Sequence, residues 1–88
     1  MKLYTAHITA TGEELCVAAR TVHHAAEVFV TFWIARTGDA PGQFYVGDGL
    51  PSGYENLVVV EAVALGDVSG VIVRKTDGSV MFDPAMGR

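Results

Sequence analysis

The sequence predicts a two-layer α+β domain, in which one long helix packs on one face of a mainly antiparallel sheet of four to five strands. Two pairs of strand-like segments are each joined by a turn, and a single helical segment lies between them. The resulting order is β-β-α-β-β-β. Because 88 residues suffice for one domain and not for two, we expect residues 1–88 to form a single unit, with Pro84–Arg88 as a short tail.

The first two segments, Lys2–Ala10 and Glu13–Arg20, are predicted to form a β-hairpin. Thr11–Gly12 supplies a tight turn, since glycine takes positive φ without steric cost. That turn would place Ile8 opposite Leu15. The apolar residues of both strands then share one face, and this agreement fixes the expected register.

The segment Thr21–Arg36 is predicted to be the helix. Thr21 is a suitable N-cap, and Gly38 is a suitable terminator. An apolar stripe at helical spacing is formed by Val22, Ala25, Ala26, Phe29, Phe32 and Trp33. We expect Trp33 to lie at the centre of the core, against the apolar face of the hairpin. Three further apolar residues lie away from the centre of this stripe: Val28, Val30 and Ile34.

The second half of the chain is rich in strand signals. Phe44–Val46 is a candidate short strand, and Glu55–Leu65 fits helix or strand by periodicity, although its β-branched run favours strand. Val71–Lys75 and Val80–Phe82 are predicted to form a second hairpin around the two-residue turn Asp77–Gly78.

A two-residue turn in the second hairpin would place Val73 opposite Phe82 and Arg74 opposite Met81. One face of the last three predicted strands then carries Val59, Val63, Leu65, Val71, Val73 and Phe82. The other face carries Val58, Val60, Ala62, Ala64, Ile72 and Met81. A sheet with one solvated face normally has a polar outer side, so two apolar faces indicate that a partner covers part of this domain.

Composition limits the classes of function. The net charge is −4 and the six Lys and Arg residues are scattered singly, which argues against direct nucleic-acid binding. No apolar run approaches the roughly 18–20 residues of a membrane span, so we expect no membrane insertion. The single cysteine, Cys16, and the absence of a signal-like start favour a reducing, cytoplasmic location.

Two pairs of side chains are candidate sites of chemistry. The predicted hairpin register makes His7 and Cys16 cross-strand neighbours, a pair that can form a thiolate nucleophile or half of a zinc site. His23 and Glu27 have the i, i+4 spacing that can hold a metal on a helix. Neither pair has a complete set of partners fixed by local spacing, so we expect no catalysis, no metal and no cofactor.

The excess of apolar surface favours a non-enzymatic protein–protein interaction module that forms a homodimer. The residues predicted to meet the partner are Val28, Val30, Ile34, Val58, Val60, Ile72 and Met81.

The alternative is an inhibitor or antitoxin of the anti-CRISPR kind, encoded by a phage or plasmid. Such a protein would block a basic site on another protein through an acidic surface. The candidate acidic residues are Glu13, Glu14, Asp48, Glu55 and Asp67. This alternative requires these residues to form one contiguous face.

Overall fold

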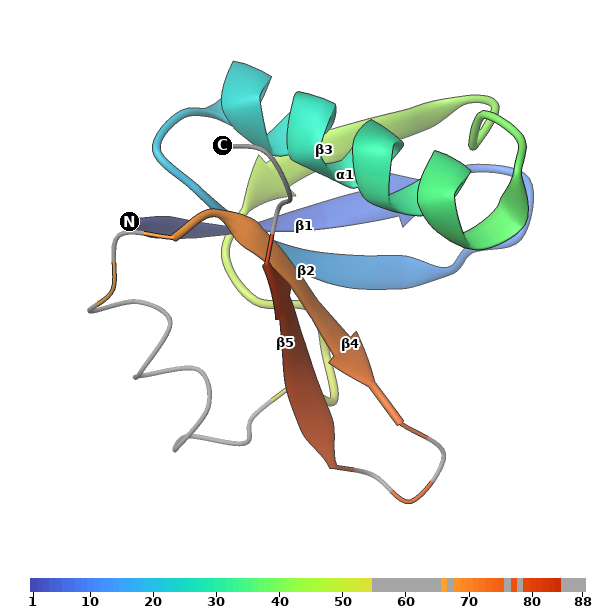
Figure 1. The fold of residues 1–88 in the computed structure, drawn as a ribbon. Helices are drawn as coiled ribbons and strands as arrows, with labels where there is room; N and C mark the ends of the chain where they lie inside the picture. The colour runs from blue at the N-terminus through green and yellow to red at the C-terminus, as the bar shows by residue number, and fades with distance from the viewer. Residues whose placement is uncertain (55–65, 67, 76, 78, 85–88) are drawn as a thin grey trace.

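The computed structural model describes residues 1–54, 66, 68–75, 77 and 79–84. It confirms the predicted α+β fold: within these residues, five antiparallel strands form one sheet and one helix packs on it (Figure 1). The elements are β1 (Lys2–Ile8), β2 (Glu14–Ala19), α1 (Val22–Thr37), β3 (Phe44–Asp48), β4 (Gly70–Arg74) and β5 (Val80–Pro84). Their order across the sheet is β3-β1-β2-β4-β5.

Some predictions fall outside the described residues. These are the strand expected over Glu55–Leu65, which contains Val58 and Val60, and the acidic residue Asp67. The predicted tail began at Pro84, but β5 includes that residue.

The β1–β2 hairpin forms with a register two residues away from the predicted one. Thr5 lies opposite Cys16 and His7 lies opposite Glu14. The reason is a longer connection, in which Gly12 N–H donates to the Ile8 carbonyl at 2.8 Å and takes φ of +75°. A shift of two residues keeps every side chain on its predicted face, so the apolar face survives although the partners change.

The helix α1 begins and ends at the predicted signals. The Thr21 hydroxyl accepts a hydrogen bond from the His24 N–H at 3.1 Å, as an N-cap does. At the other end, Gly38 takes φ of +84° and its N–H donates to the Ile34 carbonyl at 2.8 Å. This is the left-handed cap that glycine favours.

The main core lies between α1 and the sheet. Phe29 is fully buried at its centre, with its ring 4.9 Å from that of Phe44 and 5.8 Å from that of Trp33. The expectation that Trp33 forms the centre is wrong: it is only partly buried and packs against the edge of this cluster. The buried members of the cluster are Tyr4, Ala6, Ile8, Leu15, Val17, Ala19, Ala25, Val28, Phe29 and Val71.

A second, smaller core lies on the sheet face that points away from α1. Its buried residues are Cys16, Ala18, Tyr54, Ile72 and Val80. Tyr54 packs onto this face from the segment after β3, and its hydroxyl donates to the Glu14 carbonyl at 3.1 Å. Residues of the same chain therefore contribute to covering this apolar face, for which a partner was expected.

The β4–β5 hairpin has a register one residue away from the predicted one. Val73 pairs with Met81 and Ile72 pairs with Phe82, because three residues rather than two separate the hydrogen-bonded pair Lys75 and Ser79. A shift of one residue moves side chains to the opposite face. Ile72 and Met81, predicted to share a face, consequently lie on opposite faces.

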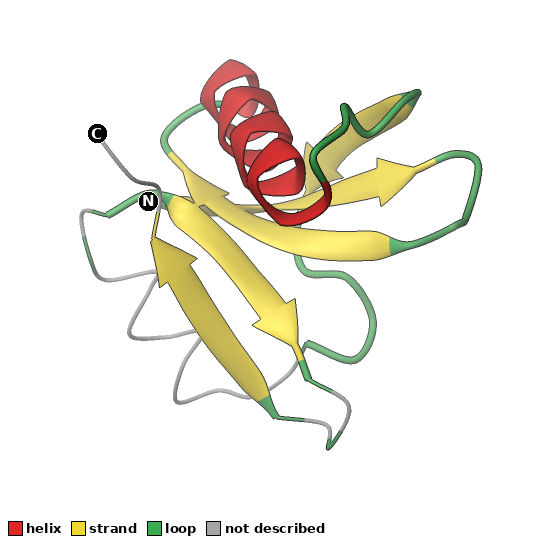
Figure 2. Cartoon of the chain, turned by 45° about the vertical axis from the view of Figure 1, so that its right-hand side comes forward, coloured by secondary structure: helices red, strands yellow, loops and turns green. Residues whose placement is uncertain are grey.

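The β4–β5 pair twists away from beneath the helix (Figure 2). The two strands lie close together at Gly70, where an added Cβ would meet the Asp83 carbonyl oxygen and would lie 2.6 Å from the Phe82 ring. The divergence leaves space between one side of α1 and the end of the sheet.

Candidate functional site

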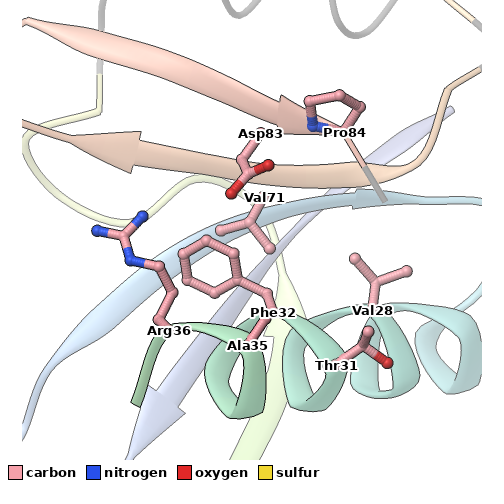
Figure 3. A pocket seen from close by; sticks show the side chains of 8 residues that line it. All are labelled: Val28, Thr31, Phe32, Ala35, Arg36, Val71, Asp83 and Pro84. Carbon is pink, nitrogen blue, oxygen red and sulfur yellow. The ribbon is translucent and has the colours of Figure 1, made fainter. Parts of the chain in front are cut away.

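A groove lies between α1 and the β4–β5 hairpin. Figure 3 shows its lining, in which side chains of the helix face those of the two strands. The helix contributes Val28, Thr31, Phe32, Ala35 and Arg36, and the strands contribute Val71, Asp83 and Pro84. The cavity volume is about 160 Å³, and we call this feature the α1–β5 groove.

The sequence positions explain why these side chains meet. Val28, Phe32 and Ala35 follow the i, i+4, i+7 spacing that places side chains on one side of a helix. Val71 and Asp83 are paired across β4 and β5, so they project from the same face of the sheet. The groove is therefore bounded by one side of α1 and by the helix-facing side of the hairpin.

The three helix residues predicted to meet a partner do not share one surface. Val28 is only 5% exposed and belongs to the main core. Val30 is half-buried against the same core, whereas Ile34 is 45% exposed. The spacing of 100° per residue separates Val28 from Val30 by 200°, which explains why these two neighbours lie on different sides of the helix.

The two strand residues predicted at the interface also differ. Ile72 is fully buried in the second core and is not available to a partner in this structure. Met81 is 41% exposed and lies on the helix-facing side of β5, next to the α1–β5 groove. Of the two, only Met81 is exposed where a second chain can reach it.

The groove carries one charge of each sign. The Arg36 guanidinium lies over the Phe32 ring, 5.1 Å from its centroid, at one side of the groove. Asp83 lines the other side. Among the described residues, the ion pairs are Lys2–Asp48 and His7–Glu14, and neither includes Arg36 or Asp83.

Of the strands in the described part of the chain, β5 lies at the edge of the sheet, beside the groove. The Lys75 N–H donates to the Ser79 carbonyl at 2.7 Å, which fixes the alternation of hydrogen-bonded pairs along the hairpin. Met81 and Asp83 therefore direct their backbone groups toward β4. Val80 and Phe82 direct theirs outward, and Pro84 offers an outward carbonyl but has no N–H.

A second cavity of about 390 Å³ lies near the C-terminal end of α1. Its lining includes Trp33, Arg36 and Arg74, together with Glu13 and Glu14. Because both signs of charge are present in equal number, the cavity does not favour an anionic or a cationic ligand.

The predicted pair of His7 and Cys16 does not form. Cys16 is fully buried opposite Thr5, and burial raises the pKa of its thiol to about 12. His7 instead makes a 3.0 Å contact from Nδ1 to the Glu14 carboxylate, and its ring stacks on Tyr45 with centroids 4.8 Å apart. The thiol stays protonated near neutral pH, and His7 is not the cross-strand neighbour that could activate it.

The helix pair of His23 and Glu27 is exposed on α1. No group of three or more His, Cys, Asp or Glu side chains suited to a metal ion occurs within the described part of the chain. The neighbouring His24 points elsewhere, with Nε2 3.0 Å from the Ser69 hydroxyl.

The described acidic residues do not form the single face that the inhibitor hypothesis requires. Asp48 pairs with Tyr4 and so projects from the helix-facing side of the sheet, 3.9 Å from Lys2. Glu14 projects from the opposite side, where it meets His7. Glu13 lies in the β1–β2 connection, and Glu55 and Asp67 lie outside the described residues.

Sequence reasoning did not identify Phe32, Arg36 and Asp83 as residues that line one groove. The sequence does indicate the contact between Phe32 and Arg36, since their i, i+4 spacing lets the guanidinium cover the ring. Asp83 was interpreted as the end of a strand, and its place beside the helix depends on the register of the second hairpin.

Known proteins provide no assignment. No protein-family model, no curated protein and no solved structure matches the chain. Within the described residues, no helix has both the length and the apolar character needed to span a membrane.

Proposed function

We propose that this protein is a non-enzymatic protein–protein interaction module that associates with a second copy of itself. The observation that carries the proposal is the α1–β5 groove, an apolar hollow beside an edge strand, with Arg36 and Asp83 on its two sides. A two-fold dimer brings one surface against the same surface of a second chain. A surface that carries both charges can complement a copy of itself.

The apolar side chains around the groove support the same proposal. Phe32 is partly buried against the main core, and Met81 is 41% exposed on the helix-facing side of β5. Covering such side chains is the principal gain in free energy when small proteins associate. A chain of this size also gains stability from a partner, because it buries a low fraction of its own surface.

The non-enzymatic part of the proposal rests on the chemistry of Cys16. Its buried, protonated thiol is unsuited to nucleophilic attack. Alkylation of the native protein, followed by an association assay, tests this point. Loss of a measurable catalytic activity on alkylation would contradict it.

Light scattering and sedimentation equilibrium of the full chain test self-association. The expected mass at micromolar concentration is twice the 9.3 kDa of one chain. Met81→Glu is expected to yield the single-chain mass, because it replaces an exposed apolar side chain of β5 with a charged one. Val22→Glu is the matched control, since Val22 is similarly exposed at 47% but belongs to α1 and not to β5. A wild-type protein that remains a monomer at these concentrations would overturn self-association.

A further inference from the structure

We propose that two copies join through antiparallel pairing of their β5 strands, around a two-fold axis that passes at Phe82. This inference rests on the proposed self-association and specifies its geometry. The pairing would extend the five-stranded sheet across both chains. Each α1–β5 groove would then border the β5 strand of the other chain.

The position of the axis follows from the outward backbone groups of β5. Phe82 is the middle residue of the strand Val80–Pro84, so pairing around it uses the whole strand. Phe82 would exchange two hydrogen bonds with Phe82 of the partner subunit. The Val80 N–H would donate to the Pro84 carbonyl of the partner subunit. Because proline has no N–H, the return bond to the Val80 carbonyl is absent, so one hydrogen bond holds each end of the pairing.

The side chains support the same axis. Pairing around Phe82 places Met81 opposite Asp83 of the partner subunit, on the helix-facing side of the joined sheet. Met81 is itself paired with Val73, and Val73 lines the second cavity together with Arg36. Arg36 also lines the α1–β5 groove with Val71, so it lies over a stretch of the sheet that includes the level at which Asp83 of the partner subunit would arrive.

The two-fold axis would generate this charge contact twice. Each Arg36 would approach the partner's Asp83, and neither residue has an ion-pair partner among the described residues of its own chain. Opposite charges at such positions favour one register over others, since a shifted strand loses both contacts. The second copy is thus the occupant that this groove complements.

Cysteine cross-linking between two single variants tests the register. Met81→Cys and Asp83→Cys chains are prepared separately, mixed, allowed to exchange subunits and oxidised. Residues opposite one another in a non-hydrogen-bonded pair have Cα atoms roughly 4.5 Å apart, within the range for a disulfide. The two copies of position 81 would instead be roughly 8 Å apart, from two residues of strand rise and one strand spacing.

The mixture is expected to yield a reducible covalent dimer that contains one chain of each kind, whereas each variant alone remains uncross-linked. The native Cys16 does not compete, because it is fully buried. Cross-linking of Met81→Cys alone would place the axis at Met81 and overturn the proposed register. A dimer by light scattering without cross-linking in any sample would overturn the β5 pairing while self-association stands. A monomer in light scattering would overturn both.

Discussion

The two parts of the sheet differ in how completely the helix covers them. In the closed half, strands β3, β1 and β2, the rings of Phe29 and Phe44 pack between α1 and the sheet, and Phe29 is inaccessible to solvent. In the open half, strands β4 and β5, the hairpin twists away and the α1–β5 groove remains (Figure 2). One helix has a limited width, so a twisted five-stranded sheet extends past it. The difference suggests that the closed half stabilises the monomer and the open half is available for association.

Alanine substitutions at two phenylalanines of α1 should separate these roles. Phe29→Ala is expected to lower the free energy of unfolding by about 3–5 kcal/mol, because it leaves a cavity in a closed core. Phe32→Ala should cost only about 1–2 kcal/mol of stability, since its ring is partly exposed. Chemical denaturation measures both losses, and sedimentation should show that Phe32→Ala also weakens association. Equal losses of stability would remove the distinction between the halves.

Alanine substitutions at two glycines compare how closely the backbone is packed in the two halves. Gly70→Ala is expected to destabilise the protein by about 1–3 kcal/mol, because the new methyl group meets the Asp83 carbonyl and the Phe82 ring. Gly47→Ala in β3 is the control, since an added Cβ there meets nothing within 4 Å. Thermal unfolding of the two variants checks the difference. A tolerated Gly70→Ala would mean that β4 and β5 are not held together at this point.

Cys16 lies at the boundary between the two halves, because it pairs with Thr5 of β1 and with Ile72 of β4. Burial raises the pKa of its thiol from 9.0 to about 12, so the unfolded chain loses the proton first as pH rises. Stability should therefore fall between pH 9 and 12, by at most about 1.4 kcal/mol per pH unit from this group. Denaturation at pH 8 to 11 measures the slope, which Cys16→Ala should reduce. If Cys16→Ala leaves the slope of stability against pH unchanged, the thiol is accessible to solvent in the native state.

Reversing the charge at Arg36 or Asp83 should give the smallest of these effects, and it tests association through the open half. Arg36→Glu alone and Asp83→Lys alone should each weaken the homodimer roughly tenfold, because each places like charges together. A mixture of the two variants should form a heterodimer of nearly wild-type affinity, since both contacts are then attractive. Lys2→Glu, which makes the same change of charge at a residue that does not line the groove, serves as the control. Sedimentation measures the affinity of association in all four samples. A mixture that does not regain nearly wild-type affinity would exclude the contact between Arg36 and the partner's Asp83.

The order of elements and both ends of α1 were predictable because they depend on local chemistry. Thr21 caps the helix through its own hydroxyl, and Gly38 ends it through its own backbone freedom. The strand pairings were harder, since the register depends on how many residues the turn contains. An error of two residues at Gly12 changed the partners but not the faces, whereas an error of one residue near Asp77 exchanged the faces.

The candidate surface could be predicted only in outline. The apolar residues of α1 that lie off its stripe predicted a partner at Val28, but Val28 is buried in the main core of its own chain. Met81 was selected for its apolar character, but its neighbours Asp83 and Arg36 become visible only when the sheet twist and the true register are known. The distance between a helix and a diverging hairpin is a property of the assembled fold, which no local pattern encodes.

The proline at the end of β5 has a consequence for solubility. A bare edge strand is a template on which further chains can add and grow into fibres. Pro84 interrupts that template, because an incoming strand finds a carbonyl there but no N–H. The proposed two-fold pairing uses that carbonyl, forgoes one hydrogen bond at each end of the strand pair, and leaves no β5 edge for a third chain. The same residue thus permits a finite assembly and opposes open-ended polymerisation.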